Sequence, residues 1–144
     1  MMVQEVHMDV RVVSTRQFGD LQVEPRHIFE FPEGIFGFDD LREFVLIADE
    51  QSAPLNWLIS IEQPEIGFPV LDPKHIDSSY SPGRDYVNDD RYAVYVIVTL
   101  SHSGMTVNLK APVILDCTNL TGKQIILSSE RYQPNQPLGK QSRA

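Results

Sequence analysis

Short runs of β-branched and aromatic residues, separated by turn residues, dominate the hydrophobic pattern of this chain. The strongest run covers residues 92–100, with Val94, Val96, Val98 and Leu100 on one face and Tyr95, Ile97 and Thr99 on the other. Because side chains alternate between the two faces of a strand, apolar groups on both faces predict a central strand.

The remaining pattern predicts further short strands and few helices. Strands are expected at residues 10–15, 21–23, 27–31, 44–48, 55–61, 68–71, 105–109, 113–117 and 123–127. Pro69 predicts an edge position for its strand, because proline cannot donate to a ladder. A single helical turn is expected after Asp39, which can cap it, and a second at residues 75–78. The fold class is therefore mainly β: a small antiparallel β-barrel-like single domain, residues 1–132, with a polar C-terminal tail, residues 133–144.

Residues 31–41 form the most informative segment. Pro32 fixes φ, and Gly34 and Gly37 supply backbone freedom, so we expect a shaped turn in which at least one glycine has a positive φ. Bulky side chains surround the glycines: Phe31, Ile35, Phe36 and Phe38. The segment has no nucleophile, histidine or cation, so it predicts architecture or a recognition surface. Phe36 and Phe38 either plug the barrel end, the interpretation we favour, or contact a partner.

Charge narrows the classes of partner. Twenty acidic against twelve basic residues give a net charge of −8, which argues against direct nucleic-acid binding and favours a basic partner. Acidity that serves only solubility is an equal alternative. The N-terminus lacks the apolar core of a signal peptide and no run approaches the length of a membrane span, so we expect a cytoplasmic protein. Cys117 lies in a strand-like apolar run, residues 113–117, and is expected to be a buried thiol.

Motifs that carry chemistry are absent from the sequence. The four histidines lack metal-ligand spacing, and the acidic segment at residues 85–90 lacks the spacing of a calcium loop. No nucleophile elbow, phosphate loop or dinucleotide fingerprint occurs. We therefore expect no catalytic residue, cofactor or metal. Aromatic residues near loops, at positions 36, 38, 68, 80 and 86, are typical of a protein-binding surface.

Four blocks in register resemble a known family. Residues 31–38 resemble the Phe-x-x-Gly-Leu-Pro-Gly-Phe signature of the bacterial flagellar assembly factor family, FliW. Residues 57–61 resemble its Leu-Gln-Ser segment, residues 106–114 its Val-Asn-Leu-x-Ala-Pro-Ile block, and residues 122–127 with Tyr132 its Gln-Val-x-Leu…Tyr ending. Two departures are Ile59, where the family usually has glutamine, and residues 133–136, where basic residues are common.

The resemblance implies a small closed barrel that acts without catalysis. It implies a protein that binds flagellin and, in alternation, the RNA-binding regulator CsrA, relieving translational repression of flagellin. We expect partner contacts from residues in the blocks that carry the resemblance: Glu33, Phe38, Asp39, Asp40 and Asn108. The alternative is a small-molecule-binding or catalytic barrel with a ligand inside or at the rim. The aliphatic strand faces disfavour that alternative.

Overall fold

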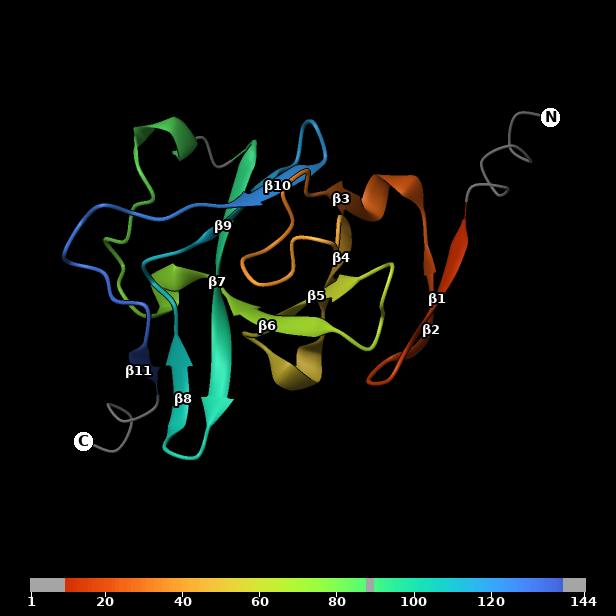
Figure 1. Ribbon diagram of the computed structural model, residues 1–144, viewed down its shortest axis with the longest axis horizontal. Helices are drawn as coiled ribbons and strands as arrows, with labels where there is room; N and C mark the ends of the chain where they lie inside the picture. The colour runs from red at the N-terminus through yellow and green to blue at the C-terminus, as the bar shows by residue number, and fades with distance from the viewer. Residues whose placement is uncertain (1–9, 88–89, 139–144) are drawn as a thin grey trace.

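The computed structural model describes residues 10–87 and 90–138, which form strands and short 3-10 turns (Figure 1). The strands are β1 (Arg11–Thr15), β2 (Gly19–Val23), β3 (Ile28–Glu30), β4 (Glu43–Ala48), β5 (Asn56–Ser60), β6 (Gly67–Leu71), β7 (Tyr92–Ser101), β8 (Gly104–Val107), β9 (Val113–Asp116), β10 (Thr121–Gln124) and β11 (Gln136–Leu138). The 3-10 turns are η1 (Pro25–His27), η2 (Glu50–Ser52), η3 (Pro73–His75) and η4 (Arg84–Tyr86).

Seven strands close a barrel in the order β3, β4, β5, β6, β7, β9 and β10. The ring closes because β7 pairs with both β6 and β9, while β10 returns to β3. The prediction of a β-barrel is confirmed. Its strands are antiparallel except at one place, where Thr121 of β10 pairs with Glu30 of β3 in parallel. The long strand β7 is central, as predicted, and its far half extends beyond the barrel to pair with β8.

Two additions flank the barrel. The β1–β2 hairpin lies at one side in Figure 1, and β8 with β11 lies at the opposite side. Strand β11 corrects the expected polar tail, because Gln136–Leu138 pair with β8 and Leu138 packs against buried residues. The rest of the expected tail, residues 139–144, lies outside the described residues.

Alternation of side chains fills the inside of the barrel and covers its outside. Inside lie eight buried residues: Phe31, Ile35, Leu41, Phe44, Leu58, Val70, Val113 and Leu115. On the outer face of β4 and β5, Val45 and Ile59 are buried under Val13 and Val23 of the β1–β2 hairpin. The hairpin covers the outer faces of β4 and β5, which explains why both strands are nearly continuous runs of apolar residues.

Two local predictions are wrong. Strand β6 is not an edge strand, because it pairs with β5 and with β7. Only Val70 and Leu71 pair with β7, so Pro69 lies outside that ladder and its missing N–H breaks no bond there. No helix begins at Asp39: a single bond from the Leu41 N–H to the Phe38 carbonyl closes one turn at Asp39 and Asp40, and β4 begins at Glu43.

Candidate partner-binding surface

The turn at residues 31–41 is anchored at its first residue. The Phe31 side chain is fully buried, and its ring meets that of Phe44 edge to face with centroids 4.9 Å apart. Its backbone N–H donates to the Arg42 carbonyl at 2.7 Å, which joins the start of the turn to its end. The Gly34 N–H then donates back to the Phe31 carbonyl at 3.0 Å. The turn is thus held by the barrel rather than by its own tip.

Both glycines of the turn adopt a left-handed backbone, as predicted. Gly34 has φ of 69° and Gly37 has φ of 87°. Between them, Ile35 and Phe38 form an isolated bridge in which the Phe38 N–H donates to the Ile35 carbonyl at 2.6 Å. The bridge makes a tight loop with Phe36 and Gly37 at its tip. Glycine is required here because other residues adopt positive φ only at a cost.

The two aromatic side chains near the tip differ in exposure. Phe38 is 37% exposed and its ring meets Phe68 edge to face at 5.1 Å, so it rests on the rim of the barrel. Phe36 is 51% exposed. The expectation that both rings plug the barrel end is wrong for Phe36, because the bridge between Ile35 and Phe38 places residue 36 at the exposed tip of the loop.

Gln124 ties the tip of this turn to the block that contains Asn108. The Phe36 N–H donates to Gln124 Oε1 at 2.9 Å, and Gln124 Nε2 donates to the Ala111 carbonyl at 3.0 Å. The Asn108 carboxamide oxygen accepts from the N–H groups of Lys110 and Ala111 at 3.2 and 3.0 Å. Sequence reasoning assigned no role to Gln124, because nothing in its local pattern shows that it faces a turn 88 residues away.

An apolar groove of about 500 Å³ runs beside this turn. We call it the Phe36 groove. It is lined by Ile35, Phe36, Phe68, Pro69, Ile97, Val98, Thr99, Leu100, Asn108, Gln124 and Pro134. Leu100 is 78% exposed although it lies on a strand predicted to be buried on both faces. Two large exposed apolar side chains at one groove mark a surface suited to protein contact.

The structure brings some of the five predicted contact residues together. Asn108 lines the Phe36 groove, and Phe38 reaches its edge through Phe68. Asp39 and Asp40 are exposed and follow Phe38 directly in the chain. Glu33 is exposed too, but it lines a separate hollow of about 290 Å³ with Pro32, Asp116 and Lys123. The Phe36 groove therefore has an apolar floor with two acids nearby.

Two further expectations about single residues are corrected. Cys117 is exposed, because β9 ends at Asp116 and the chain turns there, with Asp116 accepting from the Thr118 and Asn119 N–H groups. Tyr80 is only 4% exposed, since its ring packs on Tyr132 with centroids 4.5 Å apart. Its hydroxyl donates to the Leu109 carbonyl at 2.6 Å.

The described residues hold no group of three or more His, Cys, Asp or Glu side chains arranged to bind a metal ion. In the same part of the chain, no helix has the length and apolar character needed to cross a membrane. Every buried side-chain nitrogen or oxygen there has a hydrogen-bond partner. The barrel interior is filled by side chains such as Phe31, Phe44 and Leu58, each at most 1% exposed, which argues against a ligand inside the barrel.

Comparison with known proteins places this architecture in a family. The family model described as FliW protein matches residues 12–138, nearly the whole chain. The chain belongs to the FliW family. The resemblance in the four sequence blocks is thereby confirmed, and the protein is a non-catalytic flagellar assembly factor.

Relatives and a solved structure agree with this assignment. The flagellar assembly factor FliW of Thermotoga petrophila is 33% identical over 133 residues, covering 85% of this chain and 89% of that protein. The FliW of Caldanaerobacter subterraneus is 35% identical over 137 residues, covering 88% and 91%. A crystal structure of the flagellar assembly factor FliW superposes with a TM-score of 0.79 at 28% identity, covering 89% of this chain and 96% of that one.

Proposed function

We propose that this FliW-family protein binds flagellin and a CsrA-like RNA-binding regulator in the cytoplasm. Binding of the regulator relieves translational repression of flagellin, and flagellin competes by occupying the FliW-family protein. The adaptor binds no nucleic acid itself, because its net charge of −8 repels phosphates. The same charge attracts a basic RNA-binding partner.

The observation that carries this proposal is the Phe36 groove. It lies beside the turn at residues 31–41, which we call the family turn because it contains the first block of the FliW resemblance. Phe36 and Leu100 leave water when a partner covers the groove, and because both are already partly covered, each contributes at most about 1.5–3 kcal/mol. Asp39 and Asp40 are exposed near the end of the turn, where they can steer a basic partner without being buried. We assign contact with the CsrA-like partner to this surface, with Phe38 and Asn108 at its edge.

Gln124 supports this surface without needing to touch a partner. Its side chain fixes the Phe36 N–H and the Ala111 carbonyl at once, so it sets the position of the tip relative to the groove. Prior fixing of a contact loop lowers the entropy that binding must overcome. Glu33 lines the separate hollow of about 290 Å³ and is not assigned to this surface.

A reconstituted repression assay tests the proposal. A labelled flagellin leader RNA is first bound to the CsrA-like protein of the same organism. The FliW-family protein, the adaptor, is then titrated into this complex. We expect the RNA to be released as the adaptor is added, and we expect flagellin added afterwards to restore binding of the RNA. RNA that stays bound at a large excess of adaptor contradicts the proposal, and so does release that flagellin fails to reverse.

The alternative of a ligand-binding or catalytic barrel makes a different prediction. A small ligand needs an enclosed space with converging polar groups. The interior instead holds packed aromatic and aliphatic side chains, and Ser60, its buried hydroxyl, is engaged by the Gln63 N–H at 2.9 Å. The adaptor function is therefore the one the structure supports best.

A further inference from the structure

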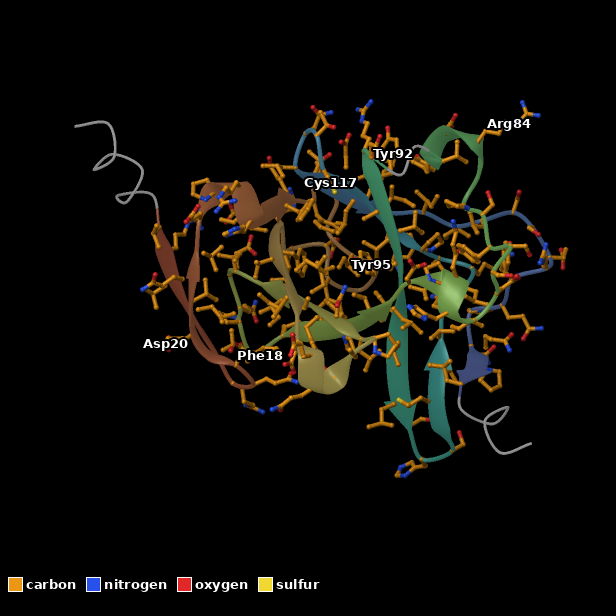
Figure 2. The ribbon with its side chains drawn as sticks, turned by 180° about the vertical axis from the view of Figure 1, so that it is seen from behind. Phe18, Asp20, Arg84, Tyr92, Tyr95 and Cys117 are labelled. Carbon is orange, nitrogen blue, oxygen red and sulfur yellow. The ribbon has the colours of Figure 1, made fainter. Side chains whose placement is uncertain are left out.

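A second hollow lies on a different part of the molecule from the Phe36 groove. It has a volume of about 410 Å³ and is lined by four tyrosines: Tyr80, Tyr86, Tyr92 and Tyr95. We call it the tyrosine hollow. Figure 2 shows Tyr92 and Tyr95 along β7, with Arg84 of η4 on the same side of the molecule. Phe18 and Asp20 of the β1–β2 hairpin lie at the opposite side.

The phenol groups of the deeper tyrosines are held within the protein. The Tyr80 hydroxyl donates to the Leu109 carbonyl, and the Tyr95 oxygen accepts from Asn56 Nδ2 at 3.1 Å. Burial raises the pKa of both phenols above the ordinary value, with neighbouring Tyr132 and Asp72 adding to the effect. Both side chains therefore stay un-ionised near neutral pH, and what they offer the hollow is neutral aromatic surface.

Two rings of the hollow already hold cations of this chain. Lys123 Nζ lies 5.1 Å from the centroid of Tyr86, and the Arg91 guanidinium carbon lies 5.0 Å from that of Tyr92. Tyr86 and Tyr92 line both the tyrosine hollow and the neighbouring smaller one, whereas Lys123 lines only the smaller one. The faces of such rings attract cations because their quadrupole is negative there.

A carboxylate completes the wall of the tyrosine hollow. Asp72 is exposed, and one of its oxygens accepts from the Lys74 N–H at 3.0 Å to cap η3. Within the described residues its second oxygen has no hydrogen-bond partner. Lys74 also lines the hollow, and no described carboxylate lies within ion-pair distance of its ammonium group. The carboxylate of Asp72 and the aromatic walls favour binding of a cation. The positive charge of Lys74 weakens that preference.

We propose that the tyrosine hollow binds the guanidinium group of an arginine side chain on a partner protein. Arginine fits better than lysine, because its planar and weakly hydrated guanidinium stacks on aromatic rings and can bond a carboxylate at the same time. The site lies apart from the Phe36 groove and goes beyond the proposed function. It would hold even if the groove bound neither flagellin nor a CsrA-like protein.

Titration with a peptide tests this site directly. The ¹⁵N-labelled protein is titrated with acetyl-Gly-Arg-Gly-amide while its amide resonances are followed by NMR. The matched peptide carries citrulline, which keeps the shape of arginine and lacks its charge. We expect the arginine peptide to shift amides at residues 80–87 and 92–95, and the citrulline peptide to leave them in place. Equal shifts from both peptides, no shifts, or shifts confined to the Phe36 groove would overturn the inference.

Charge variants give a sharper test, because replacing the acid and replacing the base should change the affinity for the arginine peptide in opposite directions. Asp72→Asn should weaken binding of the arginine peptide by about threefold or more, and Lys74→Gln should tighten it by about twofold. Tyr86→Leu should weaken it as well. Asp20→Asn makes the same charge change as Asp72→Asn on the far side of the molecule and should have no effect. Identical affinities for Asp72→Asn and Asp20→Asn, or a weakening by Lys74→Gln, would contradict a cation site.

Discussion

Gly34 and Gly37 both have a left-handed backbone, but only Gly34 is crowded by neighbouring atoms. Alanine substitutions at the two positions therefore distinguish the cost of backbone strain from the cost of a steric clash. A Cβ at Gly34 would lie 2.5 Å from the Asp39 Cα and 2.6 Å from the Phe38 carbonyl oxygen, whereas one at Gly37 would meet nothing within 4 Å. Gly37→Ala should cost about 1–2 kcal/mol of unfolding free energy from backbone strain alone. Gly34→Ala should cost about 1–3 kcal/mol more, because rigid backbone must move. Urea unfolding compares them, and equal losses would refute the packing difference.

Asp116 makes stability depend on pH. Its carboxylate accepts from Arg91 at 3.0–3.3 Å and from two backbone N–H groups, and these bonds lower its pKa to about 2 from an ordinary 3.8. A group whose folded pKa is lowered contributes stability above its unfolded pKa and loses it as pH falls through the folded one.

Wild-type stability should therefore decline between about pH 4 and pH 2 more steeply than that of Asp116→Asn. Urea unfolding at several pH values across this range measures the slopes. Asp20→Asn makes the same change in net charge and serves as the control variant. An Asp116→Asn curve parallel to the wild-type curve would show that this carboxylate is not specially stabilised.

Single residues also show where sequence reasoning ends. The positive φ values at Gly34 and Gly37 could be predicted, because glycines that bracket a short aromatic turn have a local cause. The exposure of Cys117 and the burial of Tyr80 could not, because each depends on where a strand ends or on a partner distant in sequence. Gln124 was missed for the same reason.

At the scale of elements, the apolar runs predict which segments form strands, but they do not predict which strands pair with one another. Strands β4, β5 and β7 lie within one residue of the predicted ranges, because they consist largely of apolar residues. Strand β11 was missed since its Gln-Pro-Leu sequence has no strand pattern; pairing with β8 creates it. The parallel contact between β10 and β3 depends on closure of the barrel, which no local pattern records.

Strand β7 offers a matched pair of substitutions. Val96 is fully buried and Thr99 is exposed three residues later on the same strand. Val96→Asp should destabilise the fold by several kcal/mol, because it buries an unpaired charge. Thr99→Asp should change the unfolding free energy by no more than about 0.5 kcal/mol. Thermal unfolding measures both, and a Val96→Asp protein that melts with the wild type would disprove the central position of β7.

The whole molecule is a filled barrel whose two candidate binding surfaces lie on the outside. Side chains occupy the interior, the β1–β2 hairpin covers one outer face, and β8 and β11 extend the other side (Figure 1). The Phe36 groove and the tyrosine hollow both lie along β7, the former against its far half and the latter against its first half. The sequence pointed to the turn at residues 31–41 and to aromatic residues at positions 80 and 86, but not to either hollow, because the walls of each come from segments that only the fold brings together.

The net charge of the molecule leads to a prediction about its rate of association with a basic partner. The association rate with a CsrA-like protein should fall as salt rises, since screening shortens the range of steering. Replacing Asp39 and Asp40 with Asn should slow association more than it speeds dissociation, because exposed acids beside an interface act on encounter. Stopped-flow kinetics at two salt concentrations measure both rates.

A charge-matched variant provides the control for that experiment. Asp20 and Asp85 are also exposed, and the double replacement by Asn makes the same change in net charge outside residues 31–41. It should slow association less than the Asp39 and Asp40 replacement. Rates that ignore salt and both double variants would exclude electrostatic steering, while leaving an apolar interface in place.

The binding of a CsrA-like protein to a Phe36→Ser variant tests the central claim most directly. Phe36 is half exposed at the tip of its loop, so the substitution should leave the unfolding free energy within about 0.5 kcal/mol of the wild type. Phe38→Ser, which removes the ring packed on Phe68, gives the comparison for a change that also loosens the barrel rim. If the Phe36 groove is the partner surface, calorimetric titration will show affinity weakened about tenfold or more by Phe36→Ser. A folded Phe36→Ser protein that binds with wild-type affinity would contradict the account.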